Sequence, residues 1–238
     1  MAELIDDSPT ARLAALAAGG FFLQEQPEPA KTKSSRHALL APLDALQRRM
    51  YTIRTAVPCD IDALVALETE CWVEHLHASR TEIVSRLGDP ACTTYVAVMH
   101  GAGLPPADQI AAVLYTQRID DAHALLSPSL RQPGVAGLRC PGGPIVQLLA
   151  VAARPSQHHL RLGHALREHA LQLAELGAAR QVVAITRCND FDDFAPTDAQ
   201  AADGHADMKY DTHVAAGRDA GLRFHLSAGA TAAIESRP

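Results

Sequence analysis

Hydrophobic and polar positions alternate with a period of two in several segments of this chain, and such alternation predicts β-strands. Tyr51–Thr55 is the first of these segments. Thr93–Met99 and Gln109–Arg118 follow as a pair of β-branched and apolar runs, joined by a turn that contains glycine and proline. Ile145–Ala153 and Gln181–Thr186 are mostly apolar and are also predicted to be strands. The pattern therefore predicts one sheet built mainly from strands that are close in sequence.

Apolar residues spaced by three and four positions predict helices between these strands. Pro58-Cys59-Asp60 carries the cap signal of a helix that runs to about Cys71. Ser79, with a glutamate three residues later, forms a capping-box pattern for a second helix, and Gly88 ends it. Gly163–Leu176 is a long amphipathic helix between the strands Ile145–Ala153 and Gln181–Thr186. The order of elements predicts a mixed α/β fold.

The remaining segments are less regular. Asp120–Pro144 is a long excursion rich in proline and glycine, and loops of this length in compact domains are often functional. Leu222–Gly229 is expected to form a short helix that leads into a last strand at Ala230–Glu235.

The first fifty residues differ from the rest. The apolar run Leu13–Leu23 follows acidic rather than basic residues and is too short to span a bilayer, so we expect a packing or adaptor helix there and no membrane segment. Gln24–Ser35 is a polar linker that contains proline, and His37–Arg49 is a second helical piece. We therefore divide the chain into a helical adaptor and linker segment, residues 1–50, and a catalytic domain, residues 51–238.

Composition and charge narrow the function. The formal net charge is −6 and no cluster of lysine and arginine is present, which argues against a nucleic-acid partner. The five cysteines are an odd number without C-x-x-C spacing. This pattern favours free thiols in a reducing, cytoplasmic location over a disulfide framework or a zinc site, and no metal is expected.

The order of elements from Tyr51 onward resembles the GNAT acyltransferase superfamily. In that superfamily a loop of the form Q/R-x-x-G-x-G/A binds the pyrophosphate of coenzyme A at a helix N-terminus. Aligned on Pro155 and Gly163, the loop here is H-H-L-R-L-G, which keeps only the last glycine. The resemblance implies that His158, Arg161 and Gly163 bind the carrier, with Arg161 as a charged substitute. The plain alternative is a surface turn capped by Gly163.

Two further departures concern catalysis. Amine acetylation usually needs a carboxylate that deprotonates the amine, but neither Ile145–Ala153 nor Gln181–Thr186 contains an acid. The superfamily commonly has F-Y-x-x-x-G-F near its C-terminus, with a tyrosine that protonates the departing thiolate. The matching segment here is F-H-L-S-A-G-A, which places His225 at the tyrosine position. The two strands therefore lack the usual carboxylate base, and the usual tyrosine acid is replaced by a histidine.

A narrower resemblance accounts for both departures. V-x-A-I-T-R-C at 183–188 and L-R-F-H-x-x-x-G-A resemble the GNAT-like decarboxylase domains of polyketide synthase loading modules. This resemblance implies that Thr186 and His225 are catalytic and act on a malonyl-type thioester. Trp72, at the end of an E-x-x-C-W segment, would line the acyl tunnel, and Arg237 would bind a carboxylate or phosphate. The alternatives are core packing for Trp72 and a solvated tail for Arg237.

The family implies decarboxylation of a malonyl- or alkylmalonyl-thioester to give a starter acyl group, with or without acyl transfer. The thioester would be carried by phosphopantetheine or coenzyme A, with no covalently bound cofactor. The expected partners are an acyl carrier protein and, through residues 1–50, neighbouring synthase domains. Two other functions stay open: a GNAT acetyltransferase acting on an amine or carrier thiol, and a non-catalytic docking module. The division of roles between Thr186 and His225 also stays open.

Overall fold

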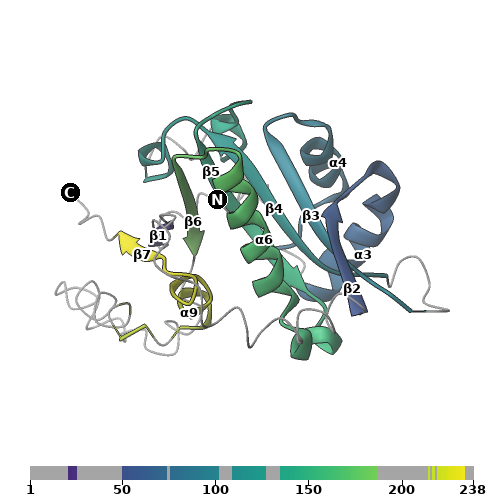
Figure 1. Cartoon of the computed structure of the whole chain (residues 1–238). Helices are drawn as coiled ribbons and strands as arrows, with labels where there is room; N and C mark the ends of the chain where they lie inside the picture. The colour runs from purple at the N-terminus through teal and green to yellow at the C-terminus, as the bar shows by residue number, and fades with distance from the viewer. Residues whose placement is uncertain are drawn as a thin grey trace, which may run out of the picture.

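The computed structural model describes residues 21–25, 50–73, 76–101, 109–126, 135–186, 214, 216, 217 and 219–233. Their strands form one seven-stranded sheet in the order β2-β3-β4-β5-β6-β1-β7 (Figure 1). Neighbouring strands are antiparallel except β5 and β6, which are parallel. The strands are β1 (Phe21–Glu25), β2 (Tyr51–Thr55), β3 (Cys92–Met99), β4 (Ile110–Ile119), β5 (Ile145–Ala153), β6 (Gln181–Thr186) and β7 (Thr231–Ala233).

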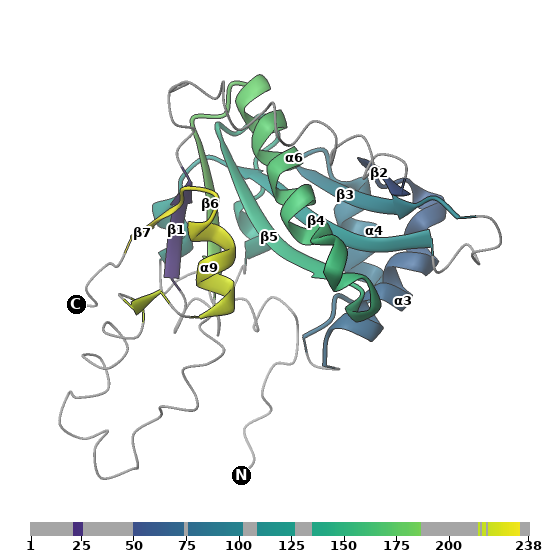
Figure 2. The ribbon, with the colours of Figure 1, turned by 60° about the horizontal axis from the view of Figure 1, so that its bottom comes forward.

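Helices cover both faces of the sheet. Helices α3 (Ile61–Cys71) and α4 (Arg80–Gly88) pack on one face, and α6 (Leu162–Leu176) and α9 (Ala220–Leu226) lie on the other (Figures 1 and 2). Short 3-10 segments complete the described elements: η1 (Pro58–Asp60), η2 (His123–Leu126), η4 (Val135–Leu138) and η5 (Pro155–Leu160). Of the excursion expected at Asp120–Pro144, the structure describes the two ends, which contain η2 and η4.

Strand β4 contributes side chains to the hydrophobic core on each face of the sheet. Ala112 and Leu114 point into the core beneath α6, whereas Val113 and Tyr115 point into the core beneath α3 and α4. Successive side chains of a strand face opposite sides of the sheet, so a strand covered on both faces must be apolar at nearly every position. All but one residue of β4 is buried.

The predicted helix starts are confirmed, although the side chain of Asp60 bonds to residues before α3 and does not cap that helix. The Ser79 hydroxyl accepts a hydrogen bond from the Glu82 N–H at 3.3 Å, and the Glu82 carboxylate accepts one from the Ser79 N–H at 2.8 Å. Asp60 makes no side-chain cap to α3. Its carboxylate accepts instead from the Val57 N–H and from the Arg54 guanidinium.

Strands β5 and β6 diverge along their length, and the predicted site residue Thr186 lies beyond the point at which they separate. Their last paired residues are Leu148 and Ala184, although β5 continues to Ala153 and β6 to Thr186. In the same region the register between β4 and β5 shifts by one residue, because Tyr115 pairs with Ala150 whereas Thr116 pairs with Leu148. The bulge increases the local twist of β5 and turns it away from β6.

Strand β1 corrects the expectation of a helix over Leu13–Leu23. Phe21–Glu25 is a strand that lies antiparallel to β6 on one side and to β7 on the other. The physical reason is that β6 and β7 are not hydrogen-bonded to each other, so a short segment with two phenylalanines satisfies the backbone groups of both. The helices expected at Thr10–Ala18 and His37–Arg49 lie outside the described residues, and the domain boundary after residue 50 stays a prediction.

No helix in the described part of the chain is both long and apolar enough to cross a lipid bilayer.

Candidate functional site

Thr186 is the last residue of β6 and lies beyond the point at which β6 stops pairing with β5. Its side chain is partly buried. On the other edge of β6 its Cα pairs with that of Phe21 in β1. Thr186 therefore has strand neighbours on the β1 side only, and on the β5 side it borders the divergence of the two parallel strands.

His225 lies in α9, and only 8% of its surface is exposed. Asp219 caps this short helix by accepting a hydrogen bond from the Leu222 N–H at 3.0 Å. In both views of the chain α9 lies beside β6 (Figures 1 and 2). The structure thus places the two predicted catalytic residues on neighbouring elements, one on a strand end and the other on a buried helix face.

Arg167 of α6 fixes α9, and the sequence analysis missed it. Its guanidinium lies 4.6 Å from the centroid of the Phe224 ring, and it donates a hydrogen bond to the Ser227 hydroxyl at 3.2 Å. Arg167 is only 2% exposed. The signal for it was its helical spacing, because it directly follows Leu166 and lies four positions after Gly163, on the side of the helix that faces α9.

The predicted carrier loop forms η5 and the start of α6. Arg161 falls at the first glycine of the superfamily pattern and adopts φ +53°, the left-handed conformation that favours glycine. His158 and Arg161 are exposed, and the His158 ring lies 3.2 Å from the Ala153 carbonyl oxygen. The loop therefore keeps the backbone shape that a glycine would give it while it presents two basic side chains to solvent.

Gly163 lies where the carrier loop, β5 and α9 meet. A Cβ atom at this position would lie 3.4 Å from Val151 Cγ2 and 3.7 Å from the Phe224 ring, which are ordinary van der Waals distances. The first turn of α6 therefore packs against both β5 and α9. The carrier loop and the helix that bears His225 are therefore parts of one packed unit on the α6 face.

Trp72 lies on the opposite face of the sheet. It follows α3, its backbone N–H donates to the Glu68 carbonyl oxygen at 3.0 Å, and its side chain packs against the α3–α4 core. Its indole Nε1 is buried and has no hydrogen-bond partner among the described residues. A role in substrate binding stays a prediction for Trp72. The other residue predicted to bind substrate, Arg237, lies outside the described residues.

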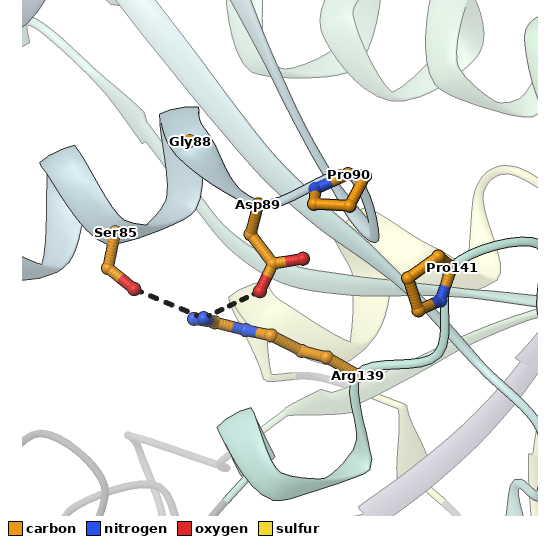
Figure 3. A pocket seen from close by; sticks show the side chains of 6 residues that line it. All are labelled: Ser85, Gly88, Asp89, Pro90, Arg139 and Pro141. Carbon is orange, nitrogen blue, oxygen red and sulfur yellow. Dashed lines mark hydrogen bonds and ion pairs between the residues drawn. The ribbon is translucent and has the colours of Figure 1, made fainter.

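A separate cavity of about 490 Å³ lies at the C-terminal end of α4, between that helix and the segment after η4 (Figure 3). Arg139 crosses it and donates hydrogen bonds at 3.2 Å to the Ser85 hydroxyl and to the Asp89 carboxylate. Its charge is thus already paired. None of the predicted site residues in the described part of the chain lines this cavity.

Comparisons with known proteins identify the fold and the family. No family model matches the chain, and no curated protein matches it. Among solved structures, the loading GNATL domain of CurA from Lyngbya majuscula aligns with a TM-score of 0.56 and 29% identity, over 76% of this chain and 84% of that one. The GphF GNAT-like decarboxylase, in complex with isobutyryl-CoA, aligns with a TM-score of 0.54 and 31% identity, over 74% of this chain and 84% of that one.

These alignments confirm the GNAT fold and the resemblance to GNAT-like decarboxylase domains. The described residues contain two diverging parallel strands, an exposed loop with His158 and Arg161 before a long helix, and a buried histidine on α9. The chain belongs to the family of GNAT-like decarboxylase domains of polyketide synthase loading modules.

Proposed function

We propose that this domain removes CO2 from a malonyl- or alkylmalonyl-thioester and so produces the starter acyl group of a polyketide synthase. The observation that carries the proposal is the 31% identity to the GphF GNAT-like decarboxylase over 84% of that chain. That protein was solved with isobutyryl-CoA. An isobutyryl thioester is the species that remains when a dimethylmalonyl thioester loses CO2 and takes up a proton.

The proposed reaction has two steps. The bond between C2 and the free carboxylate breaks, CO2 leaves, and the electron pair forms an enolate that extends over C2 and the thioester oxygen. C2 then takes up one proton. A hydrogen-bond donor that faces the thioester oxygen lowers the first barrier. The Thr186 hydroxyl and the His225 imidazole are the groups that would hold the carboxylate, stabilise the enolate and deliver the proton.

The surroundings of these residues suit loss of CO2. His225 is buried in the α6 face, whose core is formed by aliphatic side chains such as Leu162, Leu166 and Leu222. An apolar surrounding favours loss of CO2 because the charge of the substrate carboxylate is spread as the bond breaks. Neither β5 nor β6 bears an acid, so these strands contain no base for an amine. This favours decarboxylation over amine acetylation.

The carrier would bind at the exposed basic loop. The N-terminus of α6 offers backbone N–H donors and a partial positive charge, and His158 and Arg161 add basic side chains beside it. Phosphopantetheine, on coenzyme A or on an acyl carrier protein, has phosphate at one end and the thioester at the other. With the phosphate at this loop, the thioester would reach the divergence of β5 and β6.

The full chain should be tested with acyl carrier protein loaded with malonyl, methylmalonyl or dimethylmalonyl groups, with mass spectrometry of the carrier as the readout. We expect loss of CO2 from at least one of them. Thr186→Val and His225→Gln should each lower the rate about 100-fold or more. Thr52→Val on the edge strand β2 and His169→Gln on α6 are the matched controls, and we expect near-normal rates from both.

Other outcomes would contradict the proposal. No loss of CO2 by the wild-type chain, or undiminished loss in both site variants, would exclude it. Release of coenzyme A to an amine or a carrier thiol, without need for a free substrate carboxylate, would identify an acyltransferase. Binding of a partner by residues 1–50 with no turnover of any thioester would identify a docking module. Isotopic label in the acyl group would show whether it moves to a second carrier after CO2 has left.

A further inference from the structure

Arg154 is the residue at which the chain leaves β5 and enters the carrier loop. It directly follows Ala153, the last residue of β5, and precedes Pro155, the first residue of η5. Its N–H donates to the Ala111 carbonyl oxygen at 2.8 Å, so the bonding between β4 and β5 extends one residue past the strand. Its own carbonyl oxygen accepts from the Gln157 N–H at 2.9 Å. The backbone of Arg154 therefore joins the sheet to the loop.

The side chain of Arg154 reaches α3, which covers the opposite face of the sheet from α6 (Figures 1 and 2). Its Nε donates to the Ile110 carbonyl oxygen at 3.0 Å, and its guanidinium forms an ion pair with Glu70 in the last turn of α3. The Arg154 side chain is 11% exposed and that of Glu70 is 38% exposed. A guanidinium can make both contacts because its donors lie in a fixed planar fork. These two contacts depend on the side chain, so they are specific to an arginine at this position.

The carrier loop depends on such an anchor because it contributes little to the core. None of the residues of η5 is buried, and Leu160 packs only partly against the core beneath α6. The Arg161 N–H donates to the His158 carbonyl oxygen at 3.1 Å, and a local bond of this kind holds the shape of the loop but not its place on the domain. That place is fixed mainly at the two ends of the loop, by Leu162, which is 1% exposed, and by Arg154.

We infer that Arg154 is a positioning residue for the carrier, which clamps the start of the carrier loop to α3 and to the first residue of β4. The clamp holds His158, Arg161 and the first turn of α6 where they meet the phosphate, and so sets the affinity for the pantetheine carrier. This inference rests on the proposed function, in which the phosphate binds at this loop. The role of Arg154 involves no contact with the reacting atoms, so its loss should change binding and not the chemical step.

The first test measures the Kd for isobutyryl-CoA by calorimetry, and kcat and KM for the loaded acyl carrier protein, on the full chain. Arg154→Met removes the charge and the donors but keeps an unbranched apolar side chain. We expect Kd and KM to rise about tenfold, because a displacement of about 1 Å in a positioning element has an effect of this order. Because KM then follows binding alone, kcat should stay within about twofold of wild type.

Arg139→Met is the matched control. The Arg139 side chain is 18% exposed and pairs with an acid, Asp89, but it lies at the separate cavity beside α4. Its loss removes a comparable ion pair without touching the carrier loop. We therefore expect a similar loss of stability from both variants, and unchanged Kd and KM in Arg139→Met alone.

Glu70→Gln distinguishes positioning from direct contact with phosphate. If Arg154 bound the phosphate itself, loss of its acid partner would free its charge and strengthen binding. Since we assign it a positioning role, we expect weaker binding, with a Kd about threefold higher. Arg154→Lys keeps a charge beside Glu70 but lacks the fork that also reaches Ile110, so its Kd should lie between those of wild type and Arg154→Met. Equal or stronger binding by Glu70→Gln would overturn the inference.

Hydrogen exchange reports the position of the loop without any ligand. In the free full chain, Arg154→Met should exchange faster than wild type in peptides that cover residues 157–161, and Arg139→Met should not. A lower melting temperature in Arg154→Met, with unchanged exchange in this segment and unchanged affinity, would show a merely structural role and overturn the inference.

The outcomes separate this inference from the proposed function. A wild-type chain that binds isobutyryl-CoA but removes CO2 from no thioester would overturn the proposed function, and the comparison of Kd values would still decide the inference. A chain that acts on the loaded carrier protein without binding isobutyryl-CoA leaves the decision to KM, where equal values for wild type and Arg154→Met would overturn the inference. A wild-type chain that does neither would overturn both.

Discussion

Each face of the sheet contains a buried arginine that lies over an aromatic ring, but the acids near the two arginines differ. On each face a buried arginine lies 4.6 Å from the centroid of an aromatic ring, Arg86 over Tyr115 and Arg167 over Phe224. Arg86 forms an ion pair with Glu82 at 4.0 Å, whose side chain is 25% exposed, and its charge also acts on Glu68, an acid that is 2% exposed. The acid that pairs with Arg167 is Glu168, whose side chain is 53% exposed.

From this difference we expect the two arginines to contribute differently to the free energy of unfolding. Where the neighbouring acid is also buried, loss of the arginine leaves a negative charge without compensation in an apolar core. Where the acid is exposed, water solvates it after the arginine is lost, and only packing and one hydrogen bond disappear. The α3–α4 face should therefore depend on its charges for stability, and the α6 face should not.

The largest expected effect is that of Arg86→Met. The substitution keeps much of the side-chain volume but leaves Glu68 buried without the cation, and we expect it to lower the free energy of unfolding by about 3 kcal/mol. Urea unfolding of the full chain measures this. Adding Glu68→Gln to Arg86→Met should recover part of the loss, because the uncompensated charge is then gone. A loss below about 1 kcal/mol would show that the two charges do not interact across this core.

A smaller loss of stability is expected on the other face. Arg167→Met should lower the free energy of unfolding by about 1 kcal/mol, through loss of the Ser227 hydrogen bond and of the contact with Phe224. Because both contacts hold the helix that bears His225, kcat for decarboxylation should fall about tenfold while KM changes little. The exposed Arg180, changed to Met, is the control. Equal losses of stability for the Arg86 and Arg167 variants would contradict the comparison.

The smallest effect is the pH dependence of stability, which should have opposite signs on the two faces. Burial raises the pKa of Glu68 above its ordinary value of 4.5, so its contribution to stability is lost as the pH rises through the raised pKa. Burial lowers the pKa of His169 below its ordinary value of 6.5, so its contribution is lost as the pH falls through the lowered pKa.

Urea unfolding over a pH series checks this expectation with two variants. Relative to wild type, Glu68→Gln should gain stability as the pH rises from 4.5, and His169→Gln should gain stability as the pH falls from 6.5. Parallel curves for either variant and the wild type would show that the group titrates alike in the folded and unfolded chains.

Features that follow from local rules could be predicted from the sequence. The hairpin of β3 and β4 and the capping box of Ser79 and Glu82 depend on residues that are close in the chain, and the structure confirms both. The family motifs gave Thr186 and His225, and the structure places them on neighbouring elements. Their catalytic roles stay predictions.

Features that depend on distant partners could not be predicted in this way. Strand β1 was missed because the backbone groups that it pairs with belong to β6 and β7, at the other end of the chain. Glu68 was missed although a signal was present. It lies seven residues after Ile61 and four after Leu64, on the apolar side of α3, where an acid is unexpected.

The place of β1 in the sheet has a consequence for the order of folding. Strands β2 to β5 pair with neighbours in the sequence and can form while the chain is being synthesised. The segment Phe21–Glu25 leaves the ribosome before all of them, yet it must wait until β6 and then β7 have been made. During that interval β6, which ends at Thr186, is an edge strand, and its backbone groups on the β1 side are unpaired. We therefore expect the pairing of β1 with β6 and β7 to follow the pairing of β2 to β5, so Thr186 gains its β1 neighbour only at that late step.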